Sequence, residues 1–300
     1  IAVGTGPRIR PIRPQALKKA NAKFLIEADV TGIDASGHIY CNIDTDAASA
    51  DIELKKASAA ANDPRYKVEV EIVKSSGKYV MKWKDPDGNN KEKELPAGFS
   101  DGTHTIHFLA RTGSGSTDTD KTDFTFDTKA PQVEILSPDL SQNQSGDFTM
   151  RGSVIDTPGG VKSIKYIVGK QKPSDPDDIT TKPLETSTEW KPLSLSGDTW
   201  AIPFTGANNI TQKTKAQALG KMIGGLAPGV ELYEIPIFFL AEDKAGESSQ
   251  KGNIDIITKI IRADPNGDIP EVTVLSPQAD KVLGGTITIS GTVRVPNPAA

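Results

Sequence analysis

The chain has 300 residues, of which 36% are hydrophobic and 25% are charged, a balance typical of folded globular protein and a length sufficient for two ordinary domains. The net charge of −4, without a basic stripe, argues against nucleic-acid binding, and the apolar runs are shorter than the roughly 20 residues of a membrane-spanning helix. The chain begins without an initiator Met or a signal peptide, so we expect a processed product or a segment of a longer protein.

The stretch "HIYCNID" is the first with a clear strand pattern. Ile39, Cys41 and Ile43 alternate with polar residues, so they should share the buried face of a strand. Because Cys41 is the only cysteine, no intramolecular disulfide can form, and a small buried hydrophobe is favoured over a nucleophile or metal ligand. The next segment, 49–62, fits either a strand or a helix.

The stretch "YKVEVEIVKSSGKYVMKWKDPDGN" predicts a β-hairpin that turns at 75–77. Its alternation places these residues on one buried face: Val68, Val70, Ile72, Tyr79, Met81 and Trp83. On the solvent face, Glu69 and Glu71 can lie across from Lys82 and Lys84, pairs that contribute at most a few tenths of a kcal/mol each. "DPDGNN" at 85–90 has the composition of a turn between strands.

The segments "PQVEILSPDLSQNQSGDFTMRGSV" at 131–154 and "PEVTVLSPQADKVLGGTITISGTV" at 270–293 are copies of one pattern. Pro, Pro, Gly and Gly recur at the same spacings, at 131, 138, 146 and 152 and again at 270, 277, 285 and 291. An earlier copy that matches the pattern less completely begins at Pro7. Repeats this far apart are whole domains rather than solenoid units, so we expect domains at 7–129 and 130–269 and the first two strands of a third at 270–300.

A second landmark supports this division. "DGTHTIHFLARTGSGS" at 101–116 resembles "PGVELYEIPIFFLAEDKAGESS" at 228–249. The distance from the start of each repeat to this segment is longer in the second copy, which indicates the same fold with loop insertions. Short strands with 21 prolines and 27 glycines favour antiparallel sandwiches. Helix is scarce; the best candidate is "KTKAQALGKMI" at 213–223, where Ala216, Leu219 and Ile223 follow helical spacing.

The Pro-led opening pattern, the Gly-x-Val segment and the closing "FTFDTKAP" at 124–131 resemble the bacterial immunoglobulin-like (Big-type) repeats that are strung along large surface and secreted proteins. The resemblance implies an all-β fold of tandem immunoglobulin-like β-sandwiches, with a truncated third repeat. It implies no catalytic residues, because repeats of this kind have none.

No motif predicts catalysis, and we expect no catalytic residue, no cofactor and no metal ligand. His104 and His107 are three apart in a strand and point to opposite faces, so they cannot close on one metal, and His38 is expected at the surface. "SSGK" at 75–78 lacks the helical setting of acyl enzymes, and "GTG" at 4–6 is followed by Pro7 and no helix, so it cannot cradle phosphate.

The acidic segment "DPNGDIPE" at 264–271 offers oxygen ligands of the kind found in calcium loops. These are Asp264, Asn266, Asp268 and Glu271. Leu275 occupies the position of the bidentate glutamate in a helix-loop-helix calcium site, so solvated linker residues are the favoured interpretation.

Two functions fit the sequence. The first is a non-catalytic structural or adhesive segment of a bacterial surface or secreted repeat protein, located outside the cell or in the periplasm. Its partners would be neighbouring repeats and a host protein or glycan, with the binding residues unknown. The alternative is a spacer or ligand-binding region of a larger extracellular enzyme.

The tail from Pro270 should be unable to fold alone, because chains below about 40 residues rarely bury enough apolar surface. Ile287, Ile289 and Val293 alternate as in a half-buried strand and should need a facing sheet. We expect a loosely packed hairpin, or pairing with the edge of a neighbour.

Overall fold

The computed structural model describes residues 6–15, 18–60, 63–172, 175, 178–226, 228–246, 251–267, 271–276 and 288–294. The chain divides into two compact units. The first unit comprises Ile1–Pro131, Ile155–Lys162 and Glu242–Ile254, and the second comprises Gln132–Val154, Ser163–Ala241 and Asp255–Ala300. The domain boundaries expected from the repeat pattern stay predictions.

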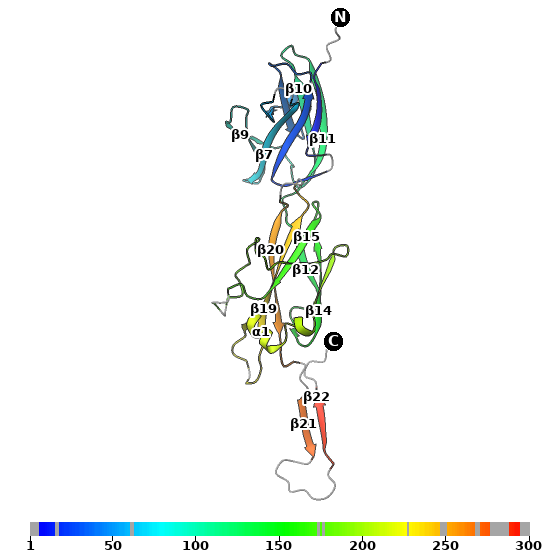
Figure 1. The fold of residues 1–300 in the computed structure, drawn as a ribbon, viewed down its shortest axis with the longest axis vertical. Coiled ribbons are helices and arrows are strands. Elements are labelled where there is room, and N and C mark those ends of the chain that lie inside the picture. Colours follow the sequence, from blue (N-terminus) through cyan, green and yellow to red (C-terminus); the bar gives the residue numbers. More distant parts are fainter. Residues whose placement is uncertain are drawn as a thin grey trace. The chain divides into compact units, whose positions relative to one another are not determined.

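The first unit contains two sheets, in the orders β1-β3-β7-β8-β9, with β6 paired to β7, and β2-β11-β10-β4-β5 (Figure 1). The strands of the first sheet are β1 Arg8–Arg13, β3 Lys23–Thr31, β6 Lys55–Lys56, β7 Arg65–Ser75, β8 Lys78–Lys84 and β9 Asn90–Glu94. Those of the second are β2 Lys19–Ala20, β4 His38–Ile43, β5 Ile52–Glu53, β10 Gly102–Arg111 and β11 Thr117–Phe126.

The opening segment of the first unit contributes one strand to each sheet. β1 pairs antiparallel with β3, whereas β2 runs parallel to the late strand β11. The remaining register pairs in both sheets are antiparallel. Strands β1, β3 and β7 on one sheet and β4, β10 and β11 on the other give the arrangement of an immunoglobulin-like sandwich.

Apolar side chains from both sheets of the first unit meet in one core. Phe24 of β3 and Phe124 of β11 are fully buried, with ring centroids 5.3 Å apart. Ile39, Cys41 and Ile43 of β4 are buried in the same cluster, as their alternation predicts.

The hairpin predicted at 68–83 is present as β7 and β8. The ladder runs from Val70 opposite Trp83 to Ser75 opposite Lys78, so Ser76 and Gly77 form the turn. Val68, Val70, Ile72 and Met81 are buried, and Tyr79 and Trp83 are partly buried against the core. "DPDGNN" connects β8 to β9 through a turn in which the Gly88 N–H donates to the Asp85 carbonyl at 2.9 Å.

The expected surface pairing has one addition. Glu71 lies opposite Lys82, as expected, and the hairpin register agrees with Glu69 lying across from Lys84, but the ion pair of Glu69 is with Lys23 of β3, at 3.1 Å. β7 is a central strand, so its outward side chains have neighbours on both sides, and the hairpin sequence reveals only one of them. The ambiguous stretch 49–62 contains the two short strands β5 and β6, preceded by a 3-10 turn, η1 Ala47–Ser49.

The second unit repeats this topology with sheets ordered β12-β14-β17 and β13-β20-β19-β15-β16, with β18 paired to β19. Its short β13 again runs parallel to the late strand β20. The strands are β12 Gln132–Ser137, β13 Asn143–Gln144, β14 Phe148–Ile155, β15 Val161–Val168, β16 Lys191–Pro192, β17 Thr199–Phe204, β18 Lys221–Met222, β19 Tyr233–Asp243 and β20 Ile254–Ala263. The two units therefore share one sandwich topology.

Inserted segments of the second unit pack on β19. The helix α1 Lys213–Leu219 lies within the predicted 213–223 and ends at Gly220, after which the chain enters β18. A Cβ at Gly220 would lie 2.9 Å from the Ile235 side chain, so α1 ends against β19. Phe238 and Phe239, neighbours on opposite faces of β19, are both fully buried. A further turn, η2 Gly206–Asn208, precedes α1.

The strands β21 Glu271–Ser276 and β22 Ser290–Arg294 form an antiparallel two-stranded sheet. Among the described residues they pair only with each other. Ile289 and Val293 are 74% and 68% exposed, which agrees with the expectation that they lack a facing sheet. Ile287 and Pro270 lie outside the described residues.

The core of the first unit provides a stability prediction. Replacing Phe24, fully buried against Phe124, by Ala should lower the free energy of unfolding of the first unit by about 3–5 kcal/mol, because the change leaves a cavity. Urea denaturation followed by circular dichroism measures this loss. Leu136→Ala, at a side chain 63% exposed, should change stability by no more than about 0.5 kcal/mol; equal effects of the two changes would contradict the core described above.

Candidate functional site

One side of the β1-β3-β7-β8-β9 sheet carries an open groove of about 750 Å³, which we call the lysine groove. Its lysines are Lys23, Lys55, Lys67, Lys82, Lys84 and Lys91. Its acidic residues are Glu69, Glu71 and Glu92. The strand alternation that buries Val68 and Val70 turns the intervening side chains outward, so the groove is lined mostly by charge.

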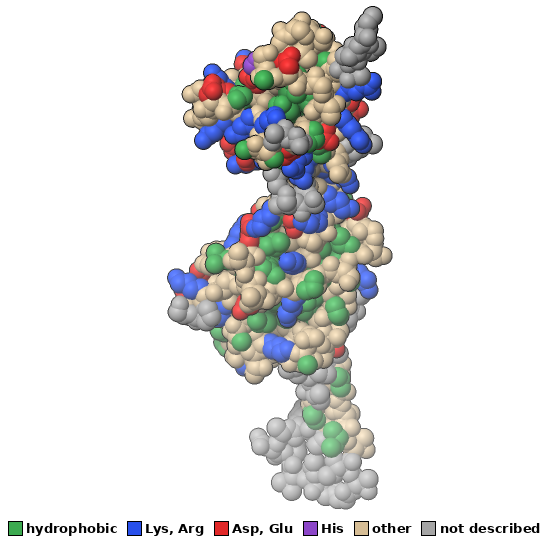
Figure 2. Space-filling model, turned by 45° about the horizontal axis from the view of Figure 1, so that its top comes forward, with side chains coloured by type: hydrophobic (Ala, Val, Ile, Leu, Met, Phe, Trp, Pro, Cys, Tyr) green, Lys and Arg blue, Asp and Glu red, His purple; other side chains and the backbone are tan. Residues whose placement is uncertain are grey.

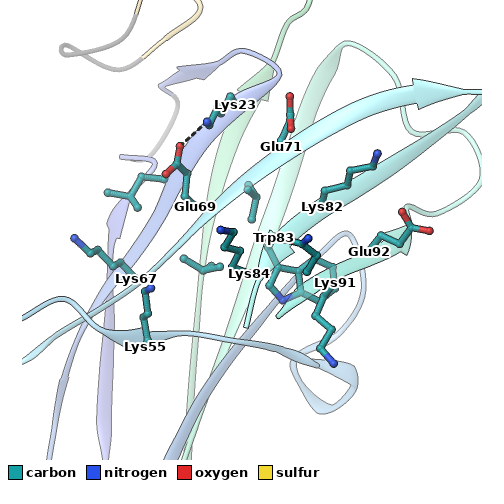
Figure 3. A pocket seen from close by; sticks show the side chains of 14 residues that line it. Lys23, Lys55, Lys67, Glu69, Glu71, Lys82, Trp83, Lys84, Lys91 and Glu92 are labelled. Atoms are coloured by element: carbon teal, nitrogen blue, oxygen red, sulfur yellow. Dashed lines mark ion pairs between the residues drawn. The ribbon is translucent and has the colours of Figure 1, made fainter. Parts of the chain in front are cut away.

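Few lysines of the groove have an acidic partner. Lys23 pairs with Glu69, as Figure 3 shows by a dashed line, and Lys91 pairs with Asp85 at 3.5 Å. Lys82 lies in register between Glu71 and Glu92 on the flanking strands. The other three lysines form no ion pair with any residue that the structure describes. The groove therefore has an excess of positive charge.

Lys55 and Lys67 face each other directly across the β6–β7 pair and lie side by side in Figure 3. Like charges opposite each other on neighbouring strands are unfavourable. Lys84, in register with the uncharged Asn90, adds a third cation on the same sheet. An anion bound at these three side chains would relieve the repulsion.

The positive excess is local. Over the face drawn in Figure 2, blue basic and red acidic side chains are interspersed on the first unit, and the whole chain has a net charge of −4. A positive groove on an acidic protein attracts anions at short range, within the screening length of about 8 Å at physiological salt.

A second cluster of charge, the aspartate cluster, also lies in the first unit. Asp127, Asp156 and Asp243 each place a carboxylate oxygen within 4.8 Å of the others. Asp127 follows β11, Asp156 follows β14, and Asp243 ends β19. Asp127 and Asp243 are fully buried.

Burial and mutual repulsion act together in the aspartate cluster. Burial, followed by the charges of Asp127 and Asp243, raises the pKa of Asp156 to about 6. Burial also raises the pKa of Asp127 and of Asp243. Three carboxylates at this spacing, of which Asp127 and Asp243 are fully buried, destabilise one another when ionised.

The three histidines lie apart from both clusters. His104 stacks on Phe99, with centroids 4.0 Å apart, and its two ring nitrogens lie within hydrogen-bond distance of the Asp44 carboxylate and the Ser100 carbonyl. His38 contacts Glu53 through Nδ1 at 2.5 Å. His107 faces Lys121 and Asn42 in the ladders of β10. Cys41 is buried, and burial raises the pKa of its thiol, which disfavours the thiolate.

The remaining motifs of the sequence occupy turns. "SSGK" at 75–78 closes the β7–β8 hairpin. Asp264 accepts a hydrogen bond from the Asn266 N–H at 3.1 Å, a local turn. Asp268, the side chain of Glu271 and most of "GTG" at 4–6 lie outside the described residues.

Sequence reasoning missed both clusters. The lysine groove depends on the pairing of β6 with β7, which the ambiguous stretch 49–62 concealed. The aspartate cluster joins residues that lie 29 and 87 positions apart along the chain, from 127 to 156 and from 156 to 243. A usable signal was present, because Asp127, Asp156 and Asp243 each stand at the end of a strand, in "FTFDTKAP", "VIDTPGG" and "FLAEDKAG".

The chain matches no protein-family model and no curated protein. Among solved structures it is similar to a 1.5-MDa bacterial ice-binding adhesin, at 14% identity and a TM-score of 0.32 over 97% of this chain and 77% of that one. It is also similar to the C-terminal domain of the Streptococcus agalactiae AgI/II polypeptide BspA, at 14% identity and a TM-score of 0.33 over 86% and 99%. Murine CEACAM1b aligns at 11% identity and a TM-score of 0.25 over 86% and 98%. At these scores the likenesses identify no ligand.

The contact between His104 and Asp44 predicts a pH-dependent stability. Burial opposes the imidazolium, but the hydrogen bonds to Asp44 and to the Ser100 carbonyl outweigh it, so the pKa of His104 is raised above 6.5. The stabilisation is therefore complete below pH 6.5 and is lost as the pH rises through the raised value. In urea denaturation, the loss caused by His104→Gln should be larger at pH 5.5 than at pH 8.5.

Asp44→Asn removes the partner carboxylate and should weaken the pH dependence in the same way. Asp120→Asn, which removes a carboxylate from the exposed face of β11, should leave it as in the unmodified chain. A His104→Gln loss that is the same at both pH values would refute the prediction.

Proposed function

We propose that this chain is a non-catalytic adhesive segment of a bacterial surface or secreted repeat protein, and that its first unit binds an acidic polysaccharide in the lysine groove. The observation that carries the proposal is the group of three groove lysines that form no ion pair among the described residues, two of them directly opposed. We call this group, Lys55, Lys67 and Lys84, the lysine triad. Glu27 lies in register with Lys67 on β3, but its ion pair is with Arg13.

The composition of the lysine groove favours a polysaccharide over a protein. Protein interfaces have an apolar core with aromatic anchors, depleted in lysine and glutamate. Here the lining is mostly charged, with Trp83 only partly exposed at one side. A hydrated, flexible, negatively charged chain matches such a surface, because it needs counter-charges more than a desolvated pocket.

Nucleic acid fits the chain less well. A duplex carries one charge per about 1.7 Å of its length, and its ligands present long basic stripes. The lysine triad is short, and Glu69, Glu71 and Glu92 interrupt the basic surface around it. A polysaccharide with one acidic group per repeat unit matches the interrupted pattern better.

A non-catalytic role is supported by the state of the reactive side chains. Cys41 is buried, and both ring nitrogens of His104 are engaged with Asp44 and Ser100. In the described part of the chain, no helix is long and apolar enough to cross a bilayer. The tandem repetition of one sandwich topology fits a protein that extends and presents binding surfaces.

The test is binding of the full chain to immobilised heparin, as a sulfated polysaccharide, and to polygalacturonate, as a carboxylated one. The variant Lys55→Ala/Lys67→Ala/Lys84→Ala should bind about tenfold more weakly, since each exposed contact is worth about 0.5 kcal/mol. Binding should also weaken as salt rises.

The matched control is Lys18→Ala/Lys74→Ala/Lys121→Ala, which removes the same charge from exposed positions outside the lysine groove. It should bind within about twofold of the unmodified chain. Equal losses in the two variants would indicate non-specific attraction and refute the site. Tighter binding to single-stranded DNA than to either polysaccharide would refute the ligand class.

A further inference from the structure

The aspartate cluster holds two buried carboxylate oxygens that lack well-aligned partners. Oδ2 of Asp127 and Oδ2 of Asp156 are both inaccessible to solvent and have no well-aligned hydrogen bond, although the backbone amides of Gly159 and Gly160 lie beside the two carboxylates and favour their ionised forms. The Asp127 side chain is fully buried, and its other oxygen accepts from the Lys129 N–H at 3.1 Å. A buried carboxylate oxygen without a well-aligned partner is costly, so such an oxygen needs a water, a proton or a cation beside it.

Both of these oxygens face the same space beside Gly159. A Cβ at Gly159 would lie 1.9 Å from Asp127 Oδ2 and 2.4 Å from Asp156 Oδ2. These distances are far below contact, so glycine is the residue that leaves room for the two oxygens to converge. The two carboxylate oxygens therefore converge on one place that the absence of a side chain at Gly159 leaves open.

The third carboxylate is held firmly in place. Asp243 Oδ1 accepts from the Asn253 N–H at 2.7 Å and the Ala245 N–H at 2.9 Å, and Oδ2 accepts from Asn253 Nδ2 at 2.7 Å. Asn253 Nδ2 also donates to the Asp127 carbonyl at 2.8 Å. A carboxylate fixed by a neighbouring amide is typical of a ligand oriented by its surroundings.

The basic group that contacts Gly159 leaves the charge of the aspartate cluster unbalanced. Lys19 Nζ donates to the Gly159 carbonyl, but among the described residues no ion pair joins it, or any other cation, to the aspartate cluster. Three carboxylates beside one ammonium leave two negative charges in a buried place. One divalent cation would balance them.

We propose that Asp127, Asp156 and Asp243 bind a calcium ion beside Gly159. Calcium takes six to eight oxygen ligands and accepts several carboxylates, whereas magnesium keeps several waters and is usually bound through one or two carboxylates. Three carboxylates with oxygens within 4.8 Å of one another therefore suit calcium better than magnesium. The site is separate from the lysine groove and does not depend on the proposed adhesive function.

The test uses the full chain, freed of metal by EDTA and dialysed. Isothermal titration with calcium chloride should show one site, and the thermal midpoint should rise with calcium. Magnesium chloride should bind at least about tenfold more weakly. Asp156→Asn, which keeps the shape and removes one charge, should weaken calcium binding by at least about tenfold.

The effect of Asp156→Asn on the melting temperature should have opposite signs with and without calcium. In EDTA the variant should melt at a higher temperature than the unmodified chain, because it relieves the repulsion, and in calcium it should melt at a lower one. Asp127→Asn should show the same two changes in melting temperature. This second variant keeps the test valid if Asp156→Asn misfolds. Asp120→Asn, on the exposed face of β11, should retain the calcium site in full.

Three outcomes would overturn the proposal. The unmodified chain could show neither heat nor stabilisation with millimolar calcium, in which case Asp127 and Asp156 share a proton instead. The Asp156→Asn and Asp127→Asn variants could both bind calcium as well as Asp120→Asn does, which would place the ion elsewhere. Magnesium could bind as tightly as calcium, which would contradict the assignment of the metal.

Discussion

The two-residue alternation of β7 is the constraint on which the first unit depends. β7 pairs with β3, β6 and β8, so its register fixes theirs. Val68, Val70 and Ile72 point into the core, and Lys67, Glu69 and Glu71 point into the lysine groove. A slip of one residue would exchange the two sets and lose both the core and the charged face. Folding and the proposed binding surface therefore follow from one periodicity.

This division between a buried face and a solvent-exposed face also explains how repeats of one fold can have different binding surfaces. In each unit the inner faces of two sheets supply stability, while the outer faces and loops are free to vary. The first unit leaves the outer face of one sheet open and charged. In the second unit β18, which follows α1, pairs with β19, and both Phe238 and Phe239 of β19 are buried.

Features with a local periodic signal could be predicted from the sequence. The burial of Cys41, the β7–β8 hairpin and the position of α1 each depend on residues a few positions apart, where alternation or helical spacing is visible. The recurrence of Pro and Gly at fixed spacings predicts repeated domains, and the boundaries at 130 and 270 stay predictions.

Features made by distant pairings could not be predicted. The ion pair of Glu69 with Lys23 needs the register of β7 against β3, and the opposition of Lys55 and Lys67 needs a short strand that its own sequence does not distinguish from helix. The aspartate cluster depends on the ends of three strands converging at Gly159. Alternation states which face a residue occupies, but not which strand lies beside it.

Thiol reactivity along β7 is the most direct measurement of this alternation. Single cysteines would replace each residue from Lys67 to Ile72 in the full chain, with Cys41, fully buried, as an internal silent thiol. Native chains should react rapidly with a thiol reagent at Lys67, Glu69 and Glu71, and at least about tenfold more slowly at the buried Val68, Val70 and Ile72. Uniform reactivity, or the reverse pattern, would contradict the register that places the core and the lysine groove on opposite faces of one sheet.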